Sequence, residues 1–133
     1  MTRHQSRTNA FLLVFQLPSN CEAADGLFHE SAEELALELD EFCESILKIT
    51  LDNLAEIDEA ITPNLNKWTL SRLPRVALAV LRISCAQLFY MSELPVSVVI
   101  NEAVELAKEY GADDDYSFVN GVLRSVADAR GLV

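Results

Sequence analysis

The stretch from Leu94 to Val126 most constrains the fold, because it predicts two amphipathic helices joined by a tight turn. Pro95 suits the start of the first helix, where its missing N–H would have no intrahelical partner. Apolar residues then recur at helical spacing and form one stripe, made of Val99, Ala103, Leu106, Ala107 and Tyr110. The buried side of the second helix is expected to consist of Val119, Val122, Leu123 and Val126. The stretch therefore predicts a helical hairpin.

The turn of this hairpin carries its own signals. Gly111 is expected to take the left-handed conformation that commonly ends a helix. Asp113, Asp114 and Asp115 follow, and we expect them to cap the second helix and to complement the positive end of its dipole. Three adjacent aspartates could also suggest a cation site. Because they lack the alternating ligands and the closing glutamate of a calcium loop, capping is the preferred interpretation.

The rest of the chain also favours helices. Its 133 residues suit a single domain, and half of them are hydrophobic, which is enough for a packed core. Glycine and proline are few and no long stretch alternates at period two, so we predict an all-α fold. No apolar run approaches the roughly 20 residues needed to cross a bilayer, and no signal-peptide cleavage site is evident. We therefore expect a cytoplasmic protein with no membrane contact.

Helical spacing predicts the remaining elements. Residues 3–17 form the first helix, with Ala10, Leu13, Val14 and Leu17 on one face and Phe11 and Phe15 beside them. Ser31 and Glu34 fit a capping box that begins a long helical run, which we expect to break near residues 37–40. Trp68 is expected to be a packing anchor between two halves of the protein rather than a base-stacking residue. Residues 73–88 form a central helix that is apolar on most sides.

Residue types that would indicate an enzyme, a metal or a cofactor are not arranged for that chemistry. Cys21, Cys43 and Cys85 have no CxxC spacing, and the latter two fall on predicted buried faces, where cysteine behaves as a small hydrophobe. His4 and His29 are not within ligand spacing of a second His or Cys. The glycines form no phosphate-binding loop. We predict a protein that is not an enzyme and has no cofactor.

The charge is unevenly distributed along the chain. The net charge is −11, which alone argues against a nucleic-acid partner. The acidic residues, however, concentrate in residues 22–59, where Lys48 is the one Lys or Arg. Residues 1–21 and 60–92 carry arginine and lysine and no acid. A polyanion could therefore bind at the first helix or the centre and be repelled elsewhere.

Several sequence words resemble a known family. Ile-Asn-Glu-Ala-Val-Glu-Leu-Ala-Lys at 100–108, Tyr-Gly-Ala-Asp-Asp at 110–114 and Phe-Val-Asn-Gly-Val-Leu at 118–123 resemble the C-terminal signature of the NusB family of bacterial transcription antitermination factors. Leu-Ala-Val-Leu-Arg-Ile at 78–83 and the pattern of Arg3, Arg7, Ala10 and Phe15-Gln16 resemble earlier family helices. The resemblance implies a NusB-like bundle of six or seven helices in one domain, residues 1–133. It further implies two perpendicular three-helix-type sub-bundles, roughly residues 1–68 and 69–133.

The same resemblance implies a function. A NusB protein binds the single-stranded boxA element of nascent ribosomal RNA together with the ribosomal protein NusE. The complex helps RNA polymerase to read through terminators. The residues expected to contact RNA are the phosphate ligands Arg3 and Arg7 with His4 assisting, the stacking platforms Phe15 and Phe118, and the base-edge contacts Asp114 and Ser117. For both phenylalanines, plain core packing is the alternative.

The chain departs from the family at positions that concern its partners. His4 stands where many relatives carry a further arginine, and Ala77 and Gln87 stand where acidic residues are common. These departures support an alternative, a helical protein-interaction or self-association module, such as a homodimer, with weak or lost RNA binding. A third interpretation, the RNA-binding domain of a larger rRNA methyltransferase, is disfavoured because the chain ends at Val133 without a catalytic domain.

Overall fold

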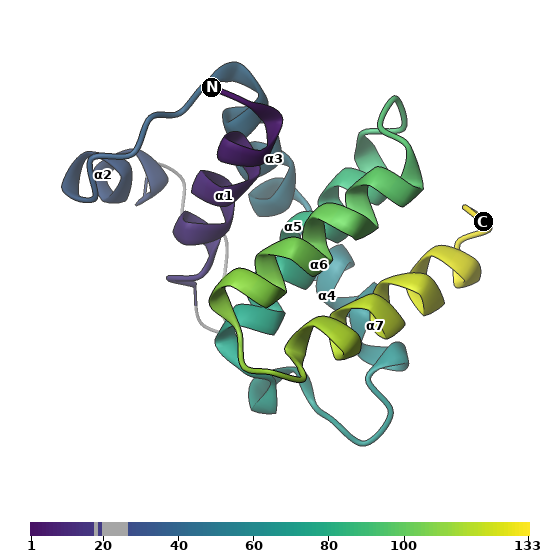
Figure 1. The fold of residues 1–133 in the computed structure, drawn as a ribbon. Coiled ribbons are helices and arrows are strands. Elements are labelled where there is room, and N and C mark those ends of the chain that lie inside the picture. The colour runs from purple at the N-terminus through teal and green to yellow at the C-terminus, as the bar shows by residue number, and fades with distance from the viewer. Residues whose placement is uncertain (18, 20–26) are drawn as a thin grey trace.

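A computed structural model describes residues 1–17, 19 and 27–133 of the chain. In this part of the chain every regular element is a helix, so the predicted all-α fold is confirmed (Figure 1). The α-helices are α1 (Arg3–Val14), α2 (Leu27–Glu34), α3 (Glu41–Asp52), α4 (Leu54–Ile61), α5 (Arg75–Tyr90), α6 (Val96–Tyr110) and α7 (Asp115–Ala129). Two short 3₁₀ helices, η1 (Thr62–Asn64) and η2 (Leu70–Arg72), lie between α4 and α5.

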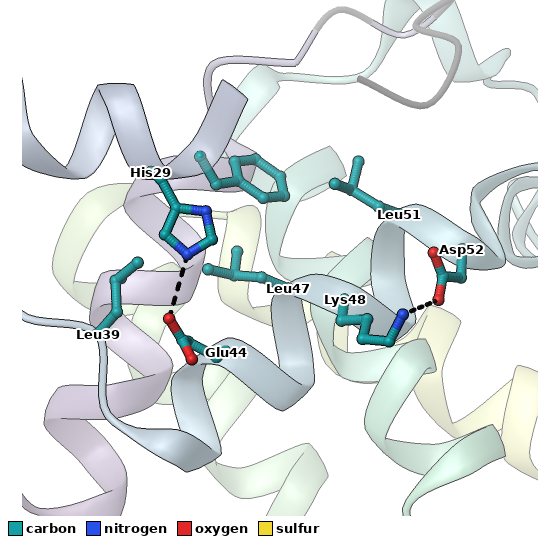
Figure 2. Close-up of a pocket in the computed structure, with 8 residues that line it drawn as sticks. His29, Leu39, Glu44, Leu47, Lys48, Leu51 and Asp52 are labelled. Atoms are coloured by element: carbon teal, nitrogen blue, oxygen red, sulfur yellow. Dashed lines mark hydrogen bonds and ion pairs between the residues drawn. The ribbon is translucent and has the colours of Figure 1, made fainter. Parts of the chain in front are cut away.

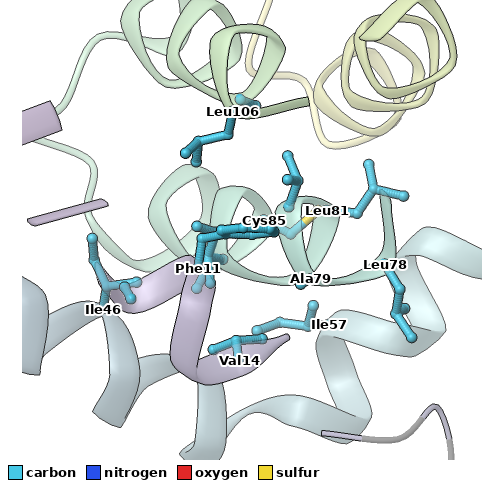
Figure 3. Packing of buried hydrophobic residues seen from close by; sticks show 14 of the residues in the cluster. Phe11, Val14, Ile46, Ile57, Leu78, Ala79, Leu81, Cys85 and Leu106 are labelled. Carbon is cyan, nitrogen blue, oxygen red and sulfur yellow. The ribbon is translucent and has the colours of Figure 1, made fainter. Parts of the chain in front are cut away.

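Helix α5 is the centre of the molecule, as its apolar sequence predicts. It packs against α1, α3, α4, α6 and α7, and every residue from Ala77 to Leu88 is buried. Side chains from all of these helices meet around it in one continuous hydrophobic cluster (Figure 3). Because the cluster runs through both predicted sub-bundles, their cores are continuous; the division at residue 68 and the perpendicular arrangement stay predictions.

The core also encloses the charged side chain of Arg82. The Arg82 guanidinium on α5 donates from Nε and Nη2 to the two carboxylate oxygens of Asp58 on α4, at 3.0 and 2.9 Å. Its Nη2 also donates to the backbone carbonyl of Ser19, at 3.0 Å. The bidentate geometry satisfies a charge that would otherwise be costly to bury. The pair therefore fixes α4 against α5.

Within the acidic segment, residues 22–59 of the sequence, the helix caps differ from the predicted ones. Ser31 does not begin a helix; it lies in the last turn of α2, so the predicted capping box is wrong. The cap of the following helix is Asp40, whose side chain accepts from the backbone N–H of Cys43 at 2.8 Å. The break predicted near residues 37–40 is confirmed, since residues 35–40 are non-helical. A second break, at Asn53, separates α3 from α4.

The hairpin of α6 and α7 is confirmed, and the two helices lie side by side (Figure 1). The backbone conformation of its turn differs from the prediction. Gly111 is extended, with φ −96° and ψ −180°, so the expected left-handed conformation is wrong. A Cβ at this position would lie 2.6 Å from the carbonyl oxygen of Ala107 and 2.8 Å from Oδ2 of Asp115. The turn therefore needs glycine for space.

The capping role of the aspartates is also corrected. Asp114 occupies the cap position of α7 but its side chain makes no capping hydrogen bond. Instead Asp115, the first residue of the helix, accepts from the backbone N–H of Ala112 at 3.0 Å. This bond closes the turn that follows Gly111, and Asp114 is exposed.

Two further expectations concern single side chains. Cys43 and Cys85 are fully buried as predicted, and burial raises the pKa of each thiol to about 12. Cys21 lies outside the described residues. Trp68 is not a buried anchor: half of its surface is exposed, which corrects the prediction.

Among the described helices, not one combines the length and the apolar character that a bilayer crossing requires.

Candidate nucleic-acid interface

The predicted RNA-contacting residues lie at the start of α7 and towards the two ends of α1. Arg3, His4 and Arg7 lie in its first turns, because a capping box between Thr2 and Gln5 begins the helix there. The Thr2 side chain accepts from the Gln5 N–H at 3.1 Å, and Gln5 Oε1 accepts from the Thr2 N–H at 2.8 Å. The helix start is thus fixed by uncharged side chains, and its cations are available for other contacts.

The three basic residues of this turn have different environments. The exposed Arg3 guanidinium lies 3.8 Å above the Phe42 ring of α3, a cation–π contact that orients it while keeping it in solvent. His4 faces α6, where its Nδ1 lies 2.8 Å from a Glu102 carboxylate oxygen and its Nε2 lies 3.8 Å from one of Glu109. The two carboxylates compete with any phosphate for the imidazole.

Arg7 is buried, with 3% of its surface exposed. Its Nε donates to Oε1 of Gln87 on α5 at 2.8 Å, and the Gln87 amide donates to the Ile83 carbonyl at 3.0 Å. Burial lowers the pKa of the Arg7 guanidinium from its ordinary value, with Glu102 opposing and Arg3 reinforcing the effect. This geometry suits a link between α1 and α5 better than a direct phosphate contact.

Phe15 lies at the other end of α1 and is partly buried. Arg75, the first residue of α5, donates from Nη2 to the Phe15 carbonyl at 2.8 Å and holds its guanidinium 4.8 Å from the ring centre. The Phe15 ring also lies 6.0 Å from that of Phe11 in the core. Phe15 therefore presents one partly accessible face beside an exposed cation.

The start of α7 holds the remaining predicted residues. Asp114 and Ser117 are exposed, and Phe118 is partly buried. Phe118 meets Trp68 edge to face, with ring centres 6.5 Å apart. Both rings line a hollow whose other walls are Leu73, Pro74, Asp114 and Asp115. Pro74 of this hollow directly precedes Arg75, the residue that contacts Phe15.

The structure thus gathers Asp114, Ser117 and Phe118 at the start of α7 and places Phe15 beside Arg75 at the end of α1. Arg3 and His4 lie about 18 Å from Phe15 along α1, at 1.5 Å per residue. Two exposed neighbours of these residues, Trp68 beside Phe118 and Arg75 beside Phe15, are not among the predicted RNA contacts. The signal was present in the charge, because Lys67, Arg72 and Arg75 are all exposed and no acid lies between residues 60 and 92. It was not present in the apolar pattern, which favoured a buried tryptophan.

A second hollow, between α2 and α3, contains none of the predicted residues (Figure 2). Phe28, Leu39, Leu47 and Leu51 form its apolar part. Its rim carries a 3.2 Å hydrogen-bond contact between His29 and Glu44 and a 3.0 Å ion pair between Lys48 and Asp52. Because this hollow lies in the acidic segment, it is unsuited to a polyanion.

Comparisons with known proteins agree on one family. The family model described as the NusB family matches residues 4–128. The transcription antitermination protein NusB of Lysinibacillus sphaericus is 39% identical over 124 residues, covering 92% of this chain and 94% of the relative. That of Bacillus mycoides is 37% identical over 128 residues, covering 96% of this chain and 98% of the relative.

The fold agrees as well. A crystal structure of the antitermination factors NusB and NusE in complex with double-stranded RNA matches with a TM-score of 0.81 and 27% identity. The match covers 96% of this chain and 96% of the matched chain. The family model and the relatives extend over nearly all of the sequence, and so does the structural match. The chain therefore belongs to the NusB family.

Proposed function

We propose that this chain is a transcription antitermination factor that binds boxA of nascent ribosomal RNA together with NusE and supports read-through by RNA polymerase. The observation that carries the proposal is the match, over 96% of the chain, to a structure of NusB and NusE with RNA. Such a protein works by binding and needs no catalytic group. Its place of action is the cytoplasm, where the nascent transcript is made.

The described geometry suggests how the roles are divided. Arg3 is the phosphate ligand of the first turn, since it is exposed and already oriented by Phe42. His4 assists when protonated, in competition with Glu102 and Glu109. Arg7 supports the site from beneath by holding α1 on α5. These assignments revise the expectation that both arginines bind phosphate directly.

At the other end of α1, the proposed contacts are to bases. Phe15 and Phe118 each keep part of a ring accessible, which allows an unpaired base to stack. Asp114 and Ser117 are exposed at the start of α7 and can accept or donate hydrogen bonds at base edges. A strand lying along α1 would meet phosphate contacts at its first turn and base contacts at its last.

The NusE contact does not depend on the two departures noted in the sequence. Ala77 is fully buried, and Gln87 is 2% exposed with its amide committed to Arg7 and Ile83. Neither side chain offers a handle on the surface of this chain. A NusE surface must therefore be formed by other, exposed residues.

The test is fluorescence anisotropy of a labelled boxA RNA, with and without NusE, against a scrambled RNA. We expect tight, sequence-dependent binding that needs NusE and weakens in Arg3→Ala. The matched control is Lys48→Ala, which removes an exposed cation from the acidic α3 and should leave RNA affinity unchanged. Equal binding of boxA and scrambled RNA in both conditions would overturn the proposal. It would favour the helical interaction or self-association module, whose oligomeric state sedimentation would then measure.

A further inference from the structure

We propose that Trp68 is a base-stacking residue, and that the hollow between Trp68 and Phe118 receives one unpaired base of the bound RNA. This inference rests on the proposed function, because it assigns a further residue to the same RNA surface. It adds the segment from residue 66 to residue 75, to which the sequence assigned only a packing role.

The position of Trp68 is fixed by its backbone. Leu65 is fully buried and Leu73 nearly so, which anchors the chain on both sides of Trp68. The Trp68 N–H donates to the Leu65 carbonyl at 3.0 Å, around a turn in which Asn66 has a φ of +57°. Asparagine tolerates this left-handed conformation better than most residues. An indole that stays half exposed on a firmly held segment is presented to solvent by the fold.

The surroundings of Trp68 match a nucleobase. The indole meets Phe118 edge to face at 6.5 Å, so the two rings form adjacent walls of the hollow rather than closing it. Leu73 and Pro74 add apolar lining, and Asp114 and Asp115 add carboxylates. A flat, apolar group with N–H donors at its edge would satisfy aromatic walls and carboxylates together.

The charged residues in and near the hollow favour a base inside it and a phosphate outside it. The carboxylates of Asp114 and Asp115 disfavour a phosphate inside the hollow. Lys67, Arg72 and Arg75, all exposed, lie in the same segment as Trp68 and favour phosphates outside it. This is the arrangement expected where an unpaired base turns inward and its backbone stays on a basic rim.

The first experiment uses Trp68 as its own reporter, because it is the chain's single tryptophan. The complex with NusE is titrated with boxA RNA while tryptophan emission and labelled-RNA anisotropy are both followed. The Trp68→Phe variant, titrated in the same way, supplies any signal from the partner. We expect emission to change in step with anisotropy in the wild-type complex only.

The second experiment identifies the base. Abasic positions are placed one at a time along boxA, and each RNA is measured against wild type and Trp68→Ala. Base–aromatic stacking predicts that Trp68→Ala weakens intact boxA about fivefold or more, and that Trp68→Phe weakens it less. At one position the abasic RNA should lose affinity for wild type but lose little further for Trp68→Ala. The control, Leu35→Ala, truncates a side chain of equal exposure beyond α2 and should change nothing.

Each remaining outcome has a distinct meaning. Binding of boxA with unchanged Trp68 emission, and no abasic position coupled to Trp68, would overturn this inference and leave the proposed function in place. Failure of the wild-type complex to bind boxA would overturn both. If Trp68→Ala unfolds, which circular dichroism detects, the emission titration and Trp68→Phe still decide the question.

Discussion

At the scale of single residues, the Arg82–Asp58 pair makes a sharp prediction about stability. Arg82 is almost completely buried and Asp58 largely so, and their bidentate contact crosses from α5 to α4. Removing the carboxylate in Asp58→Ala leaves a buried charge without its main partner. We expect a loss of about 3–5 kcal/mol in the free energy of unfolding, measured by urea denaturation.

The chain provides its own control for that measurement. Lys48 and Asp52 are four residues apart on α3, and their 3.0 Å contact is exposed on both sides. Lys48→Ala should change the free energy of unfolding by less than about 0.5 kcal/mol, as exposed helix pairs do. Equal effects of the two substitutions would contradict the role that we assign to the buried pair.

The two buried thiols predict how stability depends on pH. Burial raises the pKa of Cys43 and of Cys85 to about 12, above the ordinary value of 9.0. The folded state therefore holds these protons more tightly than the unfolded state. Their stabilising contribution is complete below about pH 9 and declines as the pH rises towards 12. Relative to a Cys43→Ala/Cys85→Ala variant, the wild type should lose stability more steeply across this window in pH-dependent urea titrations.

That comparison isolates the thiols from other groups. Burial also raises the pKa of Tyr90 and of Tyr110, so they add to any decline at high pH in both proteins. Parallel stability curves for wild type and variant above pH 9 would show that the thiols ionise as freely in the folded state as in the unfolded one.

At the scale of elements, the two glycines of the hairpin predict opposite effects of alanine. At Gly111 a Cβ would lie 2.6 Å from a backbone oxygen, so Gly111→Ala should destabilise the α6–α7 turn by about 1–3 kcal/mol. At Gly121, inside α7, a Cβ meets nothing within 4 Å, and Gly121→Ala should stabilise by about 0.5–1 kcal/mol. Thermal unfolding measures both, and a stabilising Gly111→Ala would refute the steric argument.

The same elements show how far local pattern predicts structure. Apolar spacing placed α1, α5, α6 and α7 well, because each buries one stripe or, for α5, nearly all sides. Caps were predicted less well. Ser31 and Asp40 both lie ahead of apolar residues, and the structure uses Asp40, whose carboxylate also accepts from Ser6 of α1 at 2.6 Å. That second bond comes from a distant part of the chain, so no local motif could reveal it.

The candidate site, too, could be predicted from the sequence only in part. Its members on α1 and α7 could be named from family resemblance, but their environments could not. The buried Arg7 donates a hydrogen bond to Gln87, which is 80 positions away. The sequence predicts a packing role for Trp68. In the structure, the turn at Asn66 presents this side chain to solvent. Exposure depends on tertiary contacts, and these decide whether an arginine binds a phosphate or another helix.

At the scale of the whole molecule, charge determines where RNA can approach. The net charge of −11 repels a polyanion at long range, and all of it comes from the acidic segment, residues 22–59. Exposed cations remain at the start of α1 and along residues 67–75. A strand confined to these two regions gains few ionic contacts, so we expect that a protein partner is needed for useful affinity.

The salt dependence of RNA binding tests this balance and separates the two arginines. With two or three phosphate contacts, the isolated chain should show a slope of log K against log salt of only about −1.4 to −2. Arg3→Ala should reduce the magnitude of the slope by about 0.7, because it removes one exposed phosphate contact. Arg7→Gln should lower the thermal stability of the protein and leave the slope unchanged, because its guanidinium serves Gln87. A slope that falls equally in both variants would mean that Arg7 leaves its buried position when RNA binds.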